Sequence, residues 1–246
     1  MEKRFNNFIH ILIALFSTCL HAADECLIKA DKELHLLARC REAKSTLLPP
    51  EIEALLKEGV DPNMPNARVC RKKFLGSPLC EAAYFGNAKL ANLLLQYAAR
   101  PNLIFKTEKH WKTPIHLAAR ARCKNGRYGQ VVHALLACKA NLNAGGTRRL
   151  RYTPLQLALM QKQMHKKHRK TIIDLLSSGS AELNKAVGRN KTTALHIAVR
   201  LNDVQSVKLL LAKEADREIK NAAGKTAEDL AIDSNNIHLA TAVVFS

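Results

Sequence analysis

Two short motifs in the 246-residue sequence have residue types and spacing that could do chemistry. Residues 224–226 spell GKT, the end of a phosphate-binding loop, but Ile219 stands where that loop needs its first glycine. His165 and His168 are three residues apart, a spacing that could place two metal ligands on one helical turn. The basic residues of segment 162–170 surround them and would repel a cation. We therefore expect no metal site and no small-molecule cofactor.

Three further histidines, His35, His116 and His196, recur in similar phrases near the start of predicted helices. We expect them to form hydrogen bonds to neighbouring backbone rather than to act as catalysts. The sequence contains no nucleophile-elbow motif, dinucleotide fingerprint or HExxH pair. We therefore predict that the protein has no catalytic residues and is not an enzyme.

The first 22 residues show the order of features that is typical of a secretory signal peptide. Basic residues 3–4 precede an apolar stretch over residues 8–20, and Ala22 and Ala23 then supply small residues for a peptidase. The apolar stretch is shorter than the roughly 20 residues that a membrane anchor needs. A lipoprotein is the weaker alternative, because FSTC at Cys19 lacks the residues that usually precede a lipoprotein cysteine. We predict cleavage near Ala22, a periplasmic or secreted protein, and no membrane span after cleavage.

The cysteine count agrees with export. Six cysteines would remain after cleavage, and these are Cys26, Cys40, Cys70, Cys80, Cys123 and Cys138. An even number in an exported chain permits disulfides, and we predict at least one, with Cys70 and Cys80 as the nearest-neighbour pair. The alternative is that they are ordinary small apolar residues, since Cys80 and Cys138 occupy such positions in a repeated pattern. No CxxC pair occurs, so a structural zinc site has weak support.

A recurring phrase organises the rest of the chain. It starts near residues 32, 77, 113, 153, 193 and 226, where the sequence reads KELHLLAR, SPLCEAAY, TPIHLAAR, TPLQLALM, TALHIAVR and TAEDLAID. A second apolar phrase follows each of the first five, for example VVHALLACKANLN. Similarity at a period of 20–50 residues is typical of stacked repeat proteins. We predict six units in one domain over residues 23–246.

The residue types of the first phrase suit the start of a helix. Thr or Ser caps a helix by accepting a hydrogen bond from a free backbone N–H. Proline fits the next position, where its missing N–H is not needed. Leu, Ile and Ala at helical spacing face neighbouring helices, and the alanines allow close packing. Each unit would bury its apolar face by stacking on the next unit.

These paired phrases resemble ankyrin repeats, whose unit joins a TPLHLAA helix to a second helix that ends in a GADPN-like turn. Thr113, Pro114, His116, Leu117 and Ala118 match the family phrase residue for residue. The resemblance implies an all-α solenoid of stacked helix-turn-helix units, with a β-turn finger projecting between units. It also implies a protein-binding role. A signal peptide on such repeats suggests a bacterial periplasmic or secreted protein, including an effector of a host-associated organism.

Three units depart from the pattern by insertions between their two helices. The insertions lie at residues 41–50, 122–129 and 162–170, and the finger at residues 67–76 is also lengthened. Such insertions map to surface loops and often to the binding face.

The net charge of +18 is distributed unevenly. Residues 66–191 contain 25 basic and 4 acidic residues, whereas residues 23–65 contain 6 and 9, and residues 192–246 contain 6 and 7. The alternative to function is an ordinary solvated surface of a basic protein. An excess of positive charge in the middle of the chain, between two nearly balanced ends, favours a functional basic surface. Such a surface attracts acidic partners.

The basic residues form two sets, one on the fingers and one on the insertions at 122–129 and 162–170. In the family the fingers border the concave surface that is commonly used for binding, so we predict that the fingers contact the partner. The predicted binding residues are Arg71, Lys72, Lys73, Lys106, Lys109, Arg148, Arg149 and Arg151, and Lys112, Arg189 and Lys191 belong to the same finger set.

Two classes of partner fit this surface. The first is an acidic protein, and the second is a polyanion, which could be nucleic acid, a sulfated glycan or an anionic lipid surface. Aromatic residues that could stack on bases are scarce near the basic runs, with Trp111, Tyr128 and Tyr152 among the candidates. We therefore expect an acidic protein, with a polyanion as the alternative.

Overall fold

The structure is a computed structural model that describes residues 50–63, 76–106, 111–120, 127–145, 151–160, 171, 173, 175, 177, 179, 181–234 and 236–244. Its helices are α2 (Pro50–Lys57), α3 (Pro78–Phe85), α4 (Ala88–Gln96), α5 (Pro114–Arg120), α6 (Tyr128–Ala137), α7 (Pro154–Leu159), α9 (Ala194–Arg200), α10 (Val204–Leu211), α11 (Ala227–Asp233) and α12 (Ile237–Val244). Two short strands, β1 (Phe105–Lys106) and β2 (Trp111–Lys112), form an antiparallel pair.

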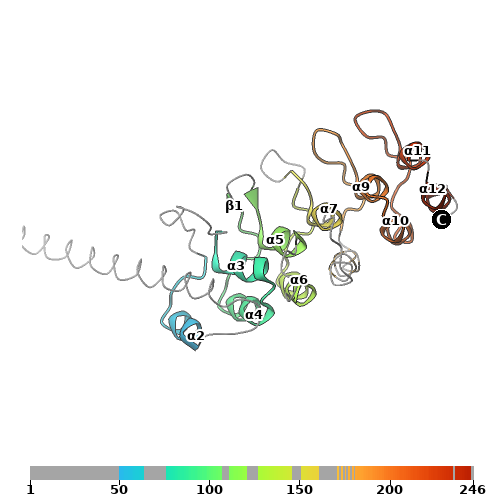
Figure 1. Ribbon diagram of the computed structural model, residues 1–246. Coiled ribbons are helices and arrows are strands. Elements are labelled where there is room, and N and C mark those ends of the chain that lie inside the picture. The colour runs from blue at the N-terminus through green and yellow to red at the C-terminus, as the bar shows by residue number, and fades with distance from the viewer. Residues whose placement is uncertain are drawn as a thin grey trace, which may run out of the picture.

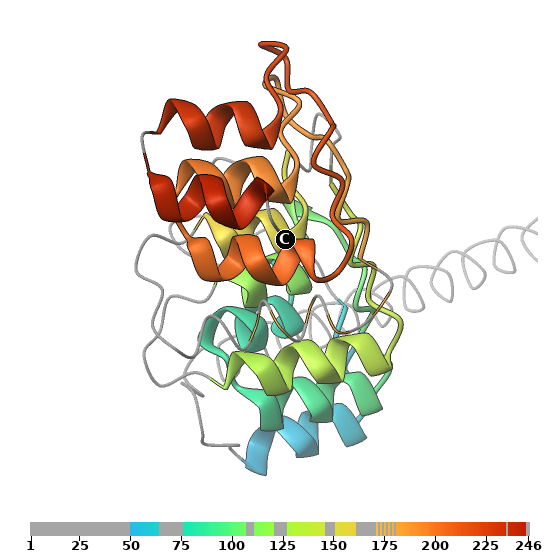
Figure 2. The same ribbon diagram turned by 90° about the vertical axis from the view of Figure 1, so that its right-hand side faces the viewer.

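The helices are arranged in two layers that run along the stack (Figures 1 and 2). In the inner layer α3, α5, α7, α9 and α11 contact one another in that order. In the outer layer α4 contacts α6, and α10 contacts α12. Each of α3, α5, α9 and α11 also packs on the outer helix that follows it. The predicted all-α solenoid of stacked helix pairs is therefore confirmed.

The helix starts follow the predicted capping chemistry. The side-chain oxygens of Ser77, Thr153, Thr193 and Thr226 each accept a hydrogen bond from the backbone N–H three residues later, at 3.1–3.4 Å. Proline occupies the first turn of α3 and α7. These caps satisfy N–H groups that have no partner inside the helix, which fixes where each inner helix begins.

Small residues let the inner helices approach closely. Ala82, Ala118, Ala158, Ala198 and Ala231 are at most 2% exposed. One backbone position is equally tight, because a Cβ on Gly76 would lie 2.4 Å from Cγ of Phe105. The φ of Gly76 is +124°, so only glycine suits both the conformation and the space. The finger before α5 therefore packs directly on the residue that precedes the α3 cap.

A row of asparagine side chains links successive units along one edge. Each side-chain oxygen accepts from the backbone N–H at the corresponding turn of the next unit, at 2.6–2.8 Å. The four links run from Asn63 to Arg100, from Asn102 to Asn141, from Asn143 to Glu182, and from Asn184 to Asp216. We call this row the asparagine ladder. The second phrase carries the signal for it, since DPN, RPN, NLN and ELN place an asparagine at the same point of each unit.

The structure corrects two expected insertion boundaries. Pro50 is the first residue of α2, and Tyr128 and Gly129 are the first residues of α6, so the insertions expected at 41–50 and 122–129 are shorter at their C-terminal ends. Residues 41–49, 122–126 and 162–170 lie outside the described residues, as do residues 1–22.

The cysteines of the described residues are free thiols. Cys80 is buried and Cys138 is exposed. The expected bond between Cys70 and Cys80 is therefore not found, and the alternative, a small buried residue, describes Cys80. Burial raises the pKa of the Cys80 thiol to about 12, which keeps it protonated and unreactive. The other cysteines lie outside the described residues.

Candidate partner-binding surface

The fingers are the segments that lead from an outer helix to the next inner helix. The described ones are named after the inner helix that follows: the α5 finger (residues 103–106 and 111–112), the α7 finger (144–145 and 151–152), the α9 finger (185–192) and the α11 finger (217–225). In both views the α5, α9 and α11 fingers extend from the same edge of the stack (Figures 1 and 2). A partner that spans this edge would contact several units at once.

In α5, α7 and α9, one polar residue near the start of the helix holds the next finger. Nε2 of His116 lies 3.1 Å from the carbonyl oxygen of Tyr152, and Nε2 of His196 lies 3.1 Å from that of Lys225. Gln156 takes the same place in α7, where its Nε2 donates to the carbonyls of Lys185 and Thr192 at 3.0 and 3.1 Å. The predicted structural role of His116 and His196 is confirmed, and His35 lies outside the described residues.

The environment of His116 agrees with a structural role. Its side chain is 1% exposed, and burial lowers its pKa to about 4, with the nearby Lys112 ammonium acting in the same direction. Burial also lowers the pKa of His196. Histidines that are neutral and fully used in hydrogen bonds within the fold have no free nitrogen for proton transfer to a ligand.

Most of the predicted binding residues lie outside the described residues. These are Arg71, Lys72, Lys73, Lys109, Arg148 and Arg149. The backbone of Lys106 belongs to β1, where it pairs with Trp111 of β2. Arg151 is exposed on the α7 finger, and its guanidinium carbon lies 5.5 Å from the centre of the Tyr152 ring. The structure therefore places two of the eight predicted residues on finger segments.

Two other expectations about the basic surface are wrong. Lys112 is 6% exposed, so it is a buried residue beside the α5 cap and not part of an open finger surface. Tyr128 is 4% exposed and donates its hydroxyl hydrogen to the carbonyl oxygen of Tyr84 at 2.9 Å. It is therefore unavailable to stack on a base. Both side chains are buried, which the residue type alone does not reveal.

The α9 finger carries two exposed basic residues, Arg189 and Lys191. It also contacts the α7 finger, since a Cβ on Gly188 would lie 3.8 Å from Cε1 of Tyr152 and 3.9 Å from Nε of Arg151. Sequence reasoning assigned Arg151, Arg189 and Lys191 to fingers but did not predict that the turn holding Arg189 and Lys191 lies against Arg151. Arg151 and Gly188 are 37 positions apart in the sequence, and no short sequence motif indicates that they lie close together.

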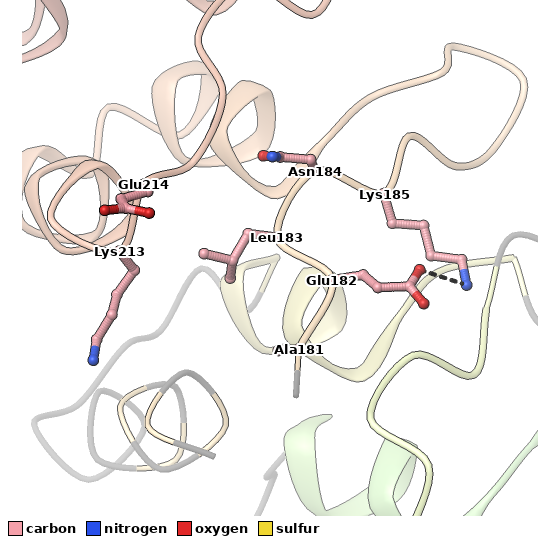
Figure 3. Close-up of a pocket in the computed structure, with 7 residues that line it drawn as sticks. All are labelled: Ala181, Glu182, Leu183, Asn184, Lys185, Lys213 and Glu214. Atoms are coloured by element: carbon pink, nitrogen blue, oxygen red, sulfur yellow. Dashed lines mark ion pairs between the residues drawn. The ribbon is translucent and has the colours of Figure 1, made fainter. Parts of the chain in front are cut away.

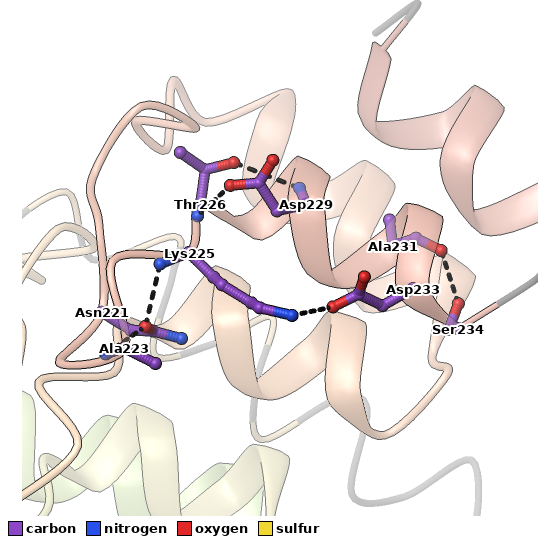
Figure 4. Close-up of polar contacts among 8 residues, drawn as sticks. All are labelled: Asn221, Ala223, Lys225, Thr226, Asp229, Ala231, Asp233 and Ser234. Atoms are coloured by element: carbon purple, nitrogen blue, oxygen red, sulfur yellow. Dashed lines mark hydrogen bonds and ion pairs between the residues drawn. The ribbon is translucent and has the colours of Figure 1, made fainter.

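The GKT segment is part of the terminal unit and not a phosphate-binding loop (Figure 4). Lys225 forms an ion pair with Asp233. Thr226 caps α11, and the carboxylate of Asp229 accepts the Thr226 N–H at 2.8 Å. This backbone hydrogen bond lowers the pKa of Asp229. The groups that would face a phosphate are therefore engaged within the fold.

A shallow hollow of about 530 Å³ lies where the turn that ends one outer helix meets the turn that ends the next (Figure 3). It is lined by Ala181, Glu182, Leu183, Asn184, Lys185, Lys213 and Glu214. Two acidic and two basic side chains line it, and Glu182 pairs with Lys185 at 3.2 Å. This balanced lining does not single out an anion or a cation as ligand.

Within the described part of the chain, no group of three His, Cys, Asp or Glu residues could hold a metal ion. No helix among the same residues has the length and apolar composition to cross a membrane.

The comparisons with known proteins agree with the architecture. A family model described as "Ankyrin repeat" matches residues 110–146, and one described as "Ankyrin repeats (3 copies)" matches residues 159–245. Together they account for about four copies, fewer than the six units that the repeated phrase predicts. Among curated proteins, the chain is 35% identical over 79 residues to "BRCA1-associated RING domain protein 1" of Caenorhabditis elegans. That match covers 32% of this chain and 10% of the relative.

Proposed function

Because the chain belongs to the ankyrin-repeat family, we propose that it is a non-catalytic, exported protein–protein interaction module that binds an acidic partner through its basic fingers. Ankyrin repeats are generally protein-interaction modules, and the family matches cover residues 110–146 and 159–245. The rest of the proposal is argued from this chain's own residues.

The observation that carries the proposal is the one-signed charge of the middle units. Residues 66–191 contain 25 basic and 4 acidic residues, an excess of 21, whereas both flanking regions are nearly balanced. A rigid stack holds fingers from successive units on one edge, so the fields of their charges add at a partner. An acidic protein surface is the complementary partner, because charge complementarity speeds association and excludes unlike partners.

The internal hydrogen bonds support a scaffold rather than an enzyme. The polar residues that recur in the inner helices are His116, Gln156 and His196, and each of them holds the backbone of the next finger. Side chains that are committed to the stack in this way position the fingers and leave the chemistry of recognition to the surface.

A polyanion is the second candidate, and the excess of 21 positive charges is the observation that favours it. Aromatic side chains for stacking on nucleic-acid bases are scarce, and Tyr128 is buried. This lowers the support for single-stranded nucleic acid and leaves sulfated glycan or an anionic lipid surface as polyanion candidates.

Export is proposed from the signal-peptide pattern of residues 1–22, which lie outside the described residues. Intact mass or N-terminal sequencing of the protein from its native host tests it. A mature protein that begins near Ala23 in the periplasm or medium is expected, and a cytoplasmic protein that retains residues 1–20 would refute export.

The partner is tested by capture from periplasm and from host-cell lysate at low and high salt. One stoichiometric acidic protein is the expected result, while salt-sensitive recovery of nucleic acid or glycan would favour the polyanion. A finger variant carries Glu at Arg71, Lys72, Lys73, Arg148, Arg149 and Arg151, and a control carries Glu at Lys166, Lys167 and Lys170. We expect the finger variant to lose more affinity and more salt dependence. A larger loss in the control would place the site at the other end of the units.

A further inference from the structure

We propose that Arg151, Arg189 and Lys191 form one recognition cluster that holds a carboxylate-rich segment of the partner. We call these three residues the finger-tip cluster. The inference rests on the proposed function and deepens it, because it names the contacting residues and the ligand chemistry on the described part of the basic surface.

The turn that carries Arg189 and Lys191 is held by hydrogen bonds within it and by one to the next finger. Val187 and Thr192 exchange both backbone hydrogen bonds at 3.1 and 3.2 Å, and the Lys191 N–H donates to the Gly188 carbonyl at 3.2 Å. On the following side, the N–H of Ala222 donates to the carbonyl of Asn190 at 2.9 Å. The tip is therefore preorganised, and a ligand does not have to order it on binding.

Arg151 joins this turn from the neighbouring finger. Its guanidinium lies beside the Tyr152 ring at 5.5 Å, a cation–π distance that restricts the long side chain. The Cβ position of Gly188 is 3.9 Å from Nε of Arg151. Arg189 directly follows Gly188, so its backbone lies close to the Arg151 side chain of the adjacent finger, and one ligand can be reached from both fingers. A guanidinium can donate two parallel hydrogen bonds to a carboxylate.

The charges of the cluster are available to a ligand. Arg151, Arg189 and Lys191 are exposed, and none of them has an ion-pair partner among the described residues. Other basic residues of the same part of the chain are paired, for example Lys185 with Glu182 and Lys225 with Asp233. The turn therefore differs from a solvated surface on which opposite charges alternate.

The backbone of Lys191 has a conformation that glycine adopts more readily. Its φ is +46°, in the left-handed region that suits glycine. The matching turn of the α11 finger has Gly224 at this place, with φ +74° and the same hydrogen bond, here from the Gly224 N–H to the Asn221 carbonyl at 3.0 Å. A lysine in this conformation costs free energy relative to glycine. Ala98, Lys139, Asn202 and Glu214 also have positive φ, so the conformation alone does not mark a binding site. The chain thus places a positive charge where its own neighbouring turn uses glycine.

The limits of the cluster favour a short acidic segment over a long polyanion. In the α11 finger Ala222 and Ala223 occupy the places of Arg189 and Asn190, and Lys225 is paired. The tip of the α11 finger, residues 222–224, therefore carries no charge, and the one exposed lysine of that finger without an ion pair in the described part of the chain, Lys220, lies outside its tip. A uniformly charged polymer gains affinity with each additional anionic group that meets a positive charge, so it suits a long row of positive charges. Three cationic groups are matched by a short segment with a few carboxylates.

The probe is a fluorescein-labelled oligoglutamate peptide, and its anisotropy is measured with the purified protein at low and high salt. We expect R189E with K191E to weaken binding roughly tenfold. K191G removes the charge and relieves the strain, so it should weaken binding several-fold while raising Tm by about 2 °C. K208E is the matched control, because Lys208 is exposed on outer helix α10, and it should bind like the wild type.

Three results would overturn the inference. K191G could bind the peptide as the wild type does, K208E could lose as much as the finger-tip variant, or labelled single-stranded DNA could bind more tightly than the peptide with the same residue dependence. The captured partner separates this inference from the proposed function. If R189E with K191E still retains that partner while the larger finger variant does not, this cluster is wrong and the proposed function stands. If the wild type retains no acidic protein, the proposed function itself fails.

Discussion

We predict that burial of neutral His116 makes the fold of this protein sensitive to acid. A carbonyl oxygen only accepts, so Nε2 of His116 carries the hydrogen that meets the Tyr152 carbonyl at 3.1 Å. Nδ1 then accepts from the Thr113 hydroxyl at 2.7 Å and faces the Thr113 N–H at 3.4 Å. A second proton on Nδ1 would point at these donors, which agrees with a pKa lowered to about 4 from 6.5.

The sign and magnitude follow from linkage. The unfolded chain takes up the proton below its pKa of 6.5, whereas the folded chain does so only near 4. The neutral His116 therefore contributes stability that is complete above about pH 6.5 and is lost as the pH falls towards 4. One pKa unit corresponds to about 1.4 kcal/mol, so the full loss is roughly 3 kcal/mol and the loss at pH 5 is roughly 2 kcal/mol. Burial lowers the pKa of His196 as well, which adds to the loss in the same direction.

The assay is urea unfolding at pH 7.5 and pH 5 for the wild type and two variants. His116→Gln copies the bond that Gln156 makes in α7 and cannot take up a proton, so its stability should change with pH by roughly 2 kcal/mol less than that of the wild type. His133→Gln makes the same change at an exposed position of α6 and should keep the wild-type pH dependence. If His116→Gln also keeps it, the neutral histidine is not the cause of acid sensitivity.

Two further predictions concern packing. Thr171 is 1% exposed, and its hydroxyl has no hydrogen-bond partner in the described part of the chain. Apolar residues, Leu90 and Val131, occupy the equivalent position of two other units, so Thr171→Val should raise the free energy of unfolding by about 1 kcal/mol in denaturant titrations. Ile232 on α11 is 59% exposed, whereas Leu159 at the same place of α7 is 2% exposed. Leu159→Ala should cost about 2–5 kcal/mol and Ile232→Ala less than about 1 kcal/mol, and equal losses would contradict this assignment of the repeats.

The stack could be predicted because its signals are local. Thr153 and Gln156 lie in one helical turn, so a short phrase contains both the cap and its partner. The surface could be predicted only in part, because it depends on contacts between units. Lys112 and Tyr128 are polar residues near basic runs, yet packing covers both of them. Arg151 becomes part of a cluster only through Gly188, which the next unit supplies.

The asparagine ladder has a mechanical consequence. Its four links fix the distance between successive turns along one edge, at hydrogen-bond lengths of 2.6–2.8 Å. An edge held in this way resists stretching, so the solenoid bends by opening or closing the helices on the opposite side. A partner that changes the curvature would therefore spread the finger tips without lengthening the ladder.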